Sequence, residues 1–329
     1  MWKYLLQRTL YALFTIWVIT LISFAVIQLP PGDYVTNLMS QMTRVSGIQL
    51  TPEYEAQLRE SYGLNEPMYV QYFKWMRNII FKGKFGDSFV YRRDAVELIT
   101  ERLPMTFTLS LGSLLLIWVI ALPIGIYSAV RQYSWGDYIF TFFGFIGLAV
   151  PNFLLALICM FITYKYFGQA LIGLFSADIA DAPWSWAKFL DLLQHLWIPV
   201  IVIGLGGTAG LIRTMRANLL DELKKPYVET ARAKGLSELK LLLKYPVRHA
   251  MNPFISTIGW ILPGLVAGEV VVAIVLNLPT SGPILYQALQ AQDQFVAAGF
   301  ILLLSILTVI GTFISDVLLV ILDPRIRLE

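Results

Sequence analysis

The chain has 329 residues, of which 57% are hydrophobic and 14% charged, and its formal net charge is +3. Soluble domains carry about 25% charged residues and place their apolar residues at the periods of amphipathic helices or strands. Here the apolar residues gather in blocks of about 20, the length of helix that crosses about 30 Å of hydrocarbon. This composition excludes a soluble globular protein and indicates an all-α integral membrane protein.

Six apolar blocks are expected to form transmembrane helices. The first follows Lys3 and Arg8 and resembles a signal peptide, but no small-residue cleavage site comes after it. We therefore interpret it as an uncleaved span with a cytoplasmic N-terminus, and an even number of spans places the C-terminus on the same side. The blocks are Leu10–Leu29, Thr106–Ala129, Tyr138–Tyr164, His195–Leu211, Phe254–Leu276 and Ala298–Leu322.

The placement of basic residues supports this orientation, because cytoplasmic segments of membrane proteins are enriched in Lys and Arg. Short segments assigned to the cytoplasm hold Arg131 and Arg213 and include a basic loop, residues 216–253. The short outer segments hold only Lys165 and Lys188.

Residues 31–104 lie on the outer side and are too many for a simple loop. They carry start and stop signals for helices: Thr51 is an N-cap candidate, Gly63 can close that helix, and Asp94 with Glu97 matches a capping box. We predict a helical cap on the outer mouth of the spans, which either stabilises the bundle or docks an external partner. The predicted organisation is an N-terminal span (1–30), this extracytoplasmic region (31–104), a core of five spans (105–322) and a cytoplasmic tail (323–329).

Catalytic and metal motifs are missing from the chain. It has no G-x-x-x-x-G-K-[ST], HExxH, CxxC or GxSxG pattern. His195 and His249 fall on opposite sides of the membrane in the predicted topology, so they cannot share a metal ion. The single cysteine, Cys159, lies within a predicted span and has no partner for an intrachain disulfide. We therefore expect no catalytic residue, no metal site and no cofactor in this chain.

Two acidic residues stand out because a carboxylate in hydrocarbon is costly and is usually functional. Glu269 lies within the fifth block, and Asp293 lies near the outer start of the sixth. Both are candidates for lining a translocation path. The alternative for Glu269 is a place at an aqueous boundary, or a pairing with a neighbouring helix or subunit.

The basic loop predicts two short helices joined at a glycine. Pro226 fits the first position of one helix, Gly235 can adopt the left-handed conformation that ends it, and Ser237 can cap the next. Apolar side chains at helical spacing follow, at Leu236, Leu239, Leu242 and Leu243. Such an elbow could be gripped by a soluble partner, whereas the simpler alternative is a solvated loop.

Within this loop, residues 227–254 resemble the cytoplasmic coupling loop of bacterial ABC importer permeases, whose consensus is Glu-Ala-Ala followed by a glycine. Here the triplet reads Glu229-Thr230-Ala231, with Gly235 at the expected spacing. The resemblance implies that the ATPase contacts come from Glu229, Thr230, Ala231, Ala233, Gly235, Leu236, Ser237 and Leu239.

The resemblance extends over most of the chain. The stretches KYLLQRTLYALFTIWVITLISFAVIQLPPGD, GLNEPMYVQYFKW, GKFGDSFVYRRDAVELITERLPMTFTLS and LDPRIR are similar to the peptide/nickel importer permeases, and to the first of their two permease subunits. This resemblance implies the type I ABC importer architecture in a bacterial cytoplasmic membrane. It also implies a second permease subunit, two ATPase subunits that bind ATP and Mg, and an extracellular or periplasmic solute-binding protein. Membrane lipid is expected to contact the chain, and nucleic acid is not.

The resemblance points to oligopeptide or dipeptide cargo, although relatives carry nickel, glutathione, sugars or other small solutes. The chain departs from the family near the expected cargo path, with Thr280 and Ser281 after Pro279 and with Ala273 where an acid is frequent. Two rival functions are an ion-coupled secondary transporter and a membrane scaffold or sensor. A secondary transporter would need more intramembrane acids and an inverted repeat, neither of which is visible.

Overall fold

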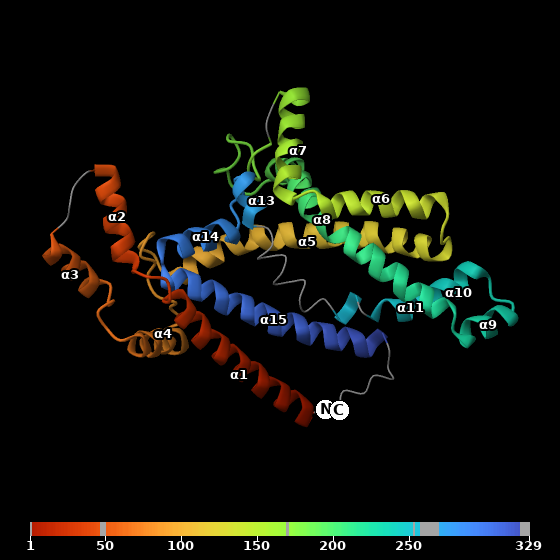
Figure 1. The fold of residues 1–329 in the computed structure, drawn as a ribbon, viewed down its shortest axis with the longest axis horizontal. Coiled ribbons are helices and arrows are strands. Elements are labelled where there is room, and N and C mark those ends of the chain that lie inside the picture. The colour runs from red at the N-terminus through yellow and green to blue at the C-terminus, as the bar shows by residue number, and fades with distance from the viewer. Residues whose placement is uncertain (1, 47–50, 169–170, 253, 257–269, 323–329) are drawn as a thin grey trace. The chain divides into compact units, whose positions relative to one another are not determined.

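A computed structural model describes residues 2–46, 51–168, 171–252, 254–256 and 270–322 (Figure 1). The described residues are almost entirely helical, and their only bridge between extended segments is an isolated antiparallel pair, Asp87 and Asp94. The all-α class expected from the sequence is confirmed. The chain divides into two compact units, one of residues 1–104 with 280–309, and one of residues 105–279 with 310–329.

Among the described residues, four helices are long and apolar enough to cross a membrane, within Thr9–Ile27, Ala95–Val130, Trp186–Leu223 and Gln294–Leu319. The structure breaks the predicted third span, Tyr138–Tyr164, into two helices bent by 96°, which pass the length and composition test for a span only as a pair. The break falls at Val150, which is extended (φ −86°, ψ 122°) because it precedes Pro151. The fifth predicted span includes residues 257–269, which lie outside the described residues.

The first unit contains α1, α2, α3, α4, α14 and the adjoining parts of α5 and α15. Their bounds are α1 Trp2–Ile27, α2 Tyr34–Ser46, α3 Pro52–Ser61, α4 Met68–Lys82, α5 Ala95–Val130, α14 Ser281–Ala291 and α15 Gln294–Leu322.

The core of the first unit is aromatic. Phe24 of α1 stacks on Trp75 of α4 with ring centroids 5.5 Å apart, and Trp75 Nε1 donates to the Phe85 carbonyl at 2.8 Å. Ala298 and Leu302 of α15 complete this buried cluster. By contrast, only 17% of the α1 span is buried, so its remaining apolar side chains are free to face lipid or another subunit.

The predicted start of α3 is confirmed, because the Thr51 side chain accepts from Tyr54 N and Gly63 follows the helix with φ +68°. Sequence reasoning missed α2. Asp33 begins it: its Oδ1 accepts from Thr36 N at 2.8 Å, as an N-cap does.

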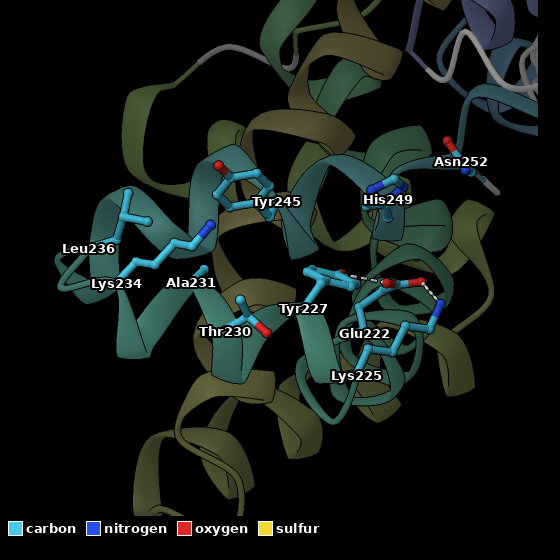
Figure 2. A pocket seen from close by; sticks show the side chains of 10 residues that line it. All are labelled: Glu222, Lys225, Tyr227, Thr230, Ala231, Lys234, Leu236, Tyr245, His249 and Asn252. Carbon is cyan, nitrogen blue, oxygen red and sulfur yellow. Dashed lines mark hydrogen bonds and ion pairs between the residues drawn. The ribbon is translucent and has the colours of Figure 1, made fainter.

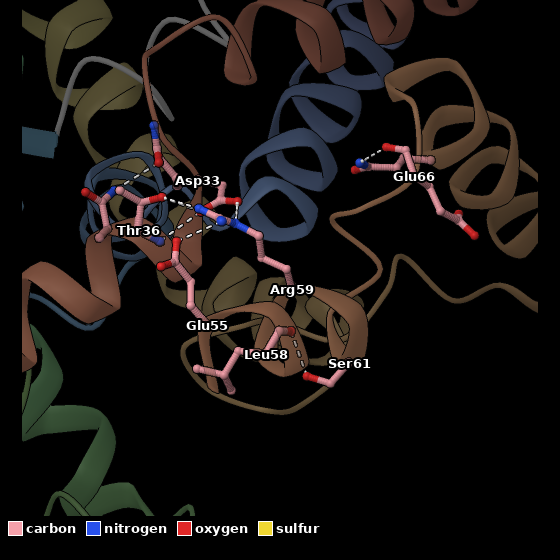
Figure 3. Close-up of polar contacts among 10 residues, drawn as sticks. Asp33, Thr36, Glu55, Leu58, Arg59, Ser61 and Glu66 are labelled. Carbon is pink, nitrogen blue, oxygen red and sulfur yellow. Dashed lines mark hydrogen bonds and ion pairs between the residues drawn. The ribbon is translucent and has the colours of Figure 1, made fainter. Parts of the chain in front are cut away.

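A cluster of polar side chains around Arg59 ties α3 to the start of α2 (Figure 3). The Arg59 guanidinium contacts Asp33 Oδ2 at 2.9 Å, Glu55 Oε1 at 2.7 Å and Thr36 Oγ1 at 3.0 Å. Burial alone would raise the pKa of Asp33, but the hydrogen bonds from Arg59 and Thr36 outweigh it and hold that pKa below its usual value. Asp33 is therefore ionised at neutral pH and its charge is compensated.

The second unit contains the rest of α5 and α15 together with α6 to α11 and α13. Their bounds are α6 Trp135–Ala149, α7 Asn152–Phe167, α8 Trp186–Leu223, α9 Pro226–Ala233, α10 Glu238–Lys244, α11 Pro246–Ala250 and α13 Val270–Val275. The central helix is α8, with 50% of its span buried. Gly125 of α5 allows α8 to pack closely against α5, because a Cβ atom at position 125 would lie 2.6 Å from Met215 Cβ.

Candidate coupling site

The basic loop folds into the elbow that the sequence predicts, formed by α9, a tight turn and α10. Pro226 occupies the first turn of α9, Gly235 has φ +78°, and Ser237 stands at the N-cap of α10. A Cβ atom at Gly235 would meet nothing within 4 Å, so the backbone conformation, and not lack of space, favours glycine. The Ser237 side chain makes no capping bond, although its carbonyl accepts from Leu241 N at 2.8 Å.

A small apolar core holds the two arms of the elbow together. Val228 and Ala231 of α9 and Leu241 of α10 are buried against one another, with Tyr227 and Tyr245 packed around them. On the surface, Arg232 of α9 donates to Glu238 of α10 through two bonds of 2.6 and 3.1 Å. This forked pair spans the Gly235 turn and adds a surface contact to the apolar core that joins the arms.

The predicted contact residues are not all on the surface. Ala231 is only 8% exposed, so it supports the elbow from inside. The exposed members are Glu229, Thr230, Ala233, Gly235, Ser237 and Leu239, and Leu236 is half-buried.

The apolar residues of α10 divide between the inside and the outside of the elbow. Leu239 and Leu243 are 68% and 55% exposed, whereas Leu241, which sequence reasoning missed, is buried. Exposed leucines four residues apart lie on the same face of a helix, and Lys240 and Lys244 flank them. This face offers two apolar side chains with a basic border, the composition of a docking surface for a partner with an acidic rim.

Behind the elbow lies a cavity of about 700 Å³ (Figure 2). Hydrogen bonds among its lining residues tie the end of α8 to α9. Glu222 of α8 accepts from Tyr227 Oη of α9 at 2.6 Å and from Lys225 Nζ at 2.7 Å. Burial and the neighbouring Glu222 carboxylate raise the pKa of Tyr227, so its hydroxyl stays a donor throughout the physiological range. His249 of α11 packs edge-on against the Tyr227 ring at 5.9 Å.

The segment after the elbow packs on the membrane helices, and an ion pair joins two of those helices to each other. Val247 and Ala250 of α11 pack against Met215 and Leu219 of α8. One turn of helix from Leu219, Arg216 donates to both carboxylate oxygens of the buried Asp137 in α6, at 3.1 and 2.8 Å.

The two predicted path residues are separate from this site. Glu269 lies outside the described residues. Asp293 belongs to the first unit, where it is fully buried and accepts from Ser88 Oγ and from the Val90 and Val296 amides. Burial raises the pKa of Asp293, and these bonds oppose the shift. In this structure Asp293 therefore fixes the 88–90 turn to the start of α15.

Among the described residues, no group of three His, Cys, Asp or Glu side chains is arranged to hold a metal ion. The elbow presents exposed leucines and lysines over a buried apolar core.

Comparison with known proteins shows the family of the chain. Residues 121–328 match the family model described as binding-protein-dependent transport system inner membrane component. Residues 1–110 match the model for the N-terminal part of such membrane components.

Several curated relatives match over nearly the whole chain. The oligopeptide transport system permease protein AppB of Bacillus subtilis is 36% identical, over 98% of this chain and 99% of AppB. The inner membrane ABC transporter permease protein YejB of Escherichia coli is 31% identical over 100% of both chains. The glutathione transport system permease protein GsiC of Salmonella paratyphi A is 29% identical over 99% of both.

A solved structure of the MetNI methionine ABC transporter in inward-facing conformations shares the fold. The likeness has a TM-score of 0.50 at 18% identity and covers 69% of this chain and 97% of that one. The chain therefore belongs to the family of binding-protein-dependent transport system inner membrane components, the multi-pass permease subunits of ABC importers.

Proposed function

We propose that this chain is the first of two different permease subunits that together form the pore of an ATP-driven peptide importer. The observation that carries the proposal is the preformed elbow, which exposes Leu239 and Leu243 while its arms are locked from within. An elbow of this kind transmits force only if a partner grips it. We assign that role to two ATPase subunits, one on the elbow of each permease.

The energy for transport comes from the partners in this proposal. The sequence has no phosphate-binding loop, so ATP and Mg belong to the ATPase subunits. When ATP closes the ATPase pair, the elbow moves and the spans shift between inward-open and outward-open states. A partner drives this change only if it binds the two states with different affinity.

The elbow lies in the cytoplasm and residues 31–104 lie outside in the proposed topology, where they meet a solute-binding protein. The ATPase contacts are Glu229, Thr230, Ala233, Gly235, Ser237 and Leu239, with Leu236 at the border, and Ala231 acts by supporting the arms. Lys240 and Lys244 add a charge that attracts an acidic rim on the ATPase.

Oligopeptides or dipeptides are the proposed cargo, supported by relatives named for oligopeptide and dipeptide transport. Glutathione, itself a small peptide, is a second candidate because GsiC is similar along its whole length. The same machinery could serve nickel or sugars, and no contact in the structure favours either.

Reconstitution tests the proposal. The chain is placed in lipid vesicles with its second permease, the ATPases and the binding protein, and uptake of labelled tetrapeptide, dipeptide and glutathione is measured. We expect uptake that requires both ATP and the binding protein. Uptake driven by an ion gradient without ATP, or no uptake of any of the three, would contradict the proposal.

A further inference from the structure

Amide side chains line two adjoining hollows of the first unit. The larger is a groove of about 600 Å³ between α2 and α14, lined by Asn37, Gln41, Gln287 and Gln290 together with Tyr34 and Val90. The smaller, of about 130 Å³, is lined by Gln28, Gln71, Gln292 and Gln294, and it shares Tyr34 with the first. The Asn37 amide donates to Gln292 Oε1 at 3.0 Å, so the two sets form one continuous track.

The inner end of the track is tied together by its own hydrogen bonds. Gln28 Nε2 donates to Gln294 Oε1 at 2.6 Å and to Gln71 Oε1 at 3.2 Å, and Gln294 Nε2 donates to Gln71 Oε1 at 3.1 Å. This set of bonds joins Gln28, the residue after α1, to α4 and α15. It explains why these three glutamines are present without any ligand.

The outer groove has hydrogen-bonding capacity to spare. Gln287 uses its Oε1 to accept from Tyr91, and Gln290 uses its Nε2 to donate to Tyr286. Within the described part of the chain, the Gln287 Nε2 donors, the Gln290 Oε1 acceptor and the whole Gln41 amide have no protein partner. The groove therefore presents both donors and acceptors.

The track also lacks net charge. The outer groove is lined by neutral side chains. The one carboxylate of the inner hollow, Asp33, is paired with Arg59 at 2.9 Å. A groove without charge does not discriminate between cargo peptides with positively charged and negatively charged side chains.

We infer that the outer groove is a transient binding site for the main chain of an extended peptide cargo. An Asn or Gln side chain carries the same C=O and N–H groups as a peptide unit, so it can bond to main chain whatever the sequence. A neutral amide surface thus suits an importer whose cargoes vary in sequence and charge. This inference rests on the proposed peptide-import function and on the outer location of the first unit.

The size of the groove favours cargo over the binding protein as its occupant. A volume of about 600 Å³ lies within the range of about 300–1,000 Å³ usual for small-molecule sites. A stable protein interface needs roughly 800 Å² per partner, more than a groove of this size offers.

The test inserts charge into the groove. In the complete importer, Gln41→Glu combined with Gln290→Glu is compared with wild type for ATP-driven uptake of Ala-Lys-Ala-Ala and Ala-Glu-Ala-Ala. Carboxylates beside the cargo favour the lysine peptide, so the ratio of lysine to glutamate peptide uptake should rise about fivefold at low salt. The binding protein is the same in both assays and cannot cause the change.

Met42→Glu, on the same helix outside the groove, is the matched control and should leave the ratio unchanged.

Two results would overturn the inference. One is an unchanged ratio in the double variant. The other is an equal rise, for both peptides, in the binding-protein concentration that gives half-maximal uptake, which would assign the groove to the binding protein. If the wild-type importer takes up neither peptide with ATP, the proposed function itself fails, and the inference that rests on it fails with it.

Discussion

The first unit and the elbow are held together over different distances along the chain. In the first unit, side-chain bonds join segments far apart in sequence, such as Gln28 with Gln294 and Ser88 with Asp293. In the elbow, the apolar core and the ion pair lie within residues 227–245. Long-range bonds fix distant segments in one arrangement, whereas local bonds preserve the shape of a small element when its surroundings move. The elbow is therefore suited to act as a rigid handle, and the first unit as a fixed frame.

The largest effect is expected for Gly235→Pro. Proline requires φ near −65°, opposite in sign to the observed +78°, and it removes the Gly235 N–H bond to the Arg232 carbonyl. Strain and the lost bond together cost roughly 2–4 kcal/mol. We expect ATP-driven uptake in vesicles to fall by about a hundredfold while membrane insertion is normal.

Gly63→Pro is the matched control for this variant. Gly63 also has positive φ and open space around it, and its N–H bonds to the Glu60 carbonyl in the same way. It lies in the first unit and outside the elbow, so its strain should leave ATPase binding intact, whereas Gly235→Pro should weaken it. Equal losses in both variants would mean that misfolding, and not the elbow, explains the effect.

The next largest effect is expected for Leu239→Ser. Burial of a leucine against a partner is worth about 1.5–3 kcal/mol, so ATPase affinity for the permease in nanodiscs should fall by about thirtyfold. The free permease should be unaffected, because Leu239 is already exposed. Leu239→Met, which keeps the apolar surface, should bind almost normally. Wild-type affinity in the serine variant would show that this face does not dock the ATPase.

A smaller effect, about tenfold on coupled uptake, is expected for Ala231→Leu. The added atoms overpack the contact with Val228 and Leu241 at a cost of roughly 1–3 kcal/mol and force the arms apart. Proteolysis at the Gly235 turn should become faster in the same variant. Ala233→Leu adds the same atoms at an exposed position and should leave proteolysis unchanged, and identical proteolysis of both variants would refute the buried role of Ala231.

The smallest effect is expected in the first unit, for Arg59→Leu. The Arg59 and Asp33 side chains are partly exposed, so their interaction contributes no more than about 1 kcal/mol to stability. Its loss should make amide exchange in α2 and α3 about fivefold faster. The pKa of Asp33 is lowered in the fold. Its contribution is therefore present above the usual aspartate pKa of about 4 and is lost as pH falls through the lower, folded value.

The difference in exchange between wild type and this variant should thus shrink as the pH is lowered below about 4. Lys74→Leu, which breaks the more exposed pair with Glu66, should change exchange less. A difference that stays constant with pH would show that Asp33 is not the partner that matters.

Local signals in the sequence were sufficient for the elbow. Pro226 and Gly235 each act on their own backbone, so their positions predict a helix and the turn that ends it, whereas Ser237 stands at the predicted N-cap without making the side-chain bond. The burial of Leu241 in place of Leu239 was not predictable, because Leu236, Leu239, Leu241, Leu242 and Leu243 offer more than one apolar face. Packing against Val228 and Ala231 decides among them.

Two other features have local signals that the sequence analysis overlooked, and a third has causes that are not local. The break between α6 and α7 follows from Pro151, whose effect on the preceding residue is readable in the sequence. The start of α2 at Asp33 after Gly32 is also a readable cap signal. The grouping of residues 280–309 with the N-terminal part depends on bonds across about two hundred residues, which no local pattern reveals.

The bidentate contact between Arg216 and Asp137 has a mechanical consequence. Two parallel hydrogen bonds resist rotation about either one of them. A pull on the C-terminal end of α8 is therefore transmitted to the beginning of α6. In the proposed topology, a displacement imposed at the cytoplasmic surface would thus enter the bilayer along two neighbouring helices in concert.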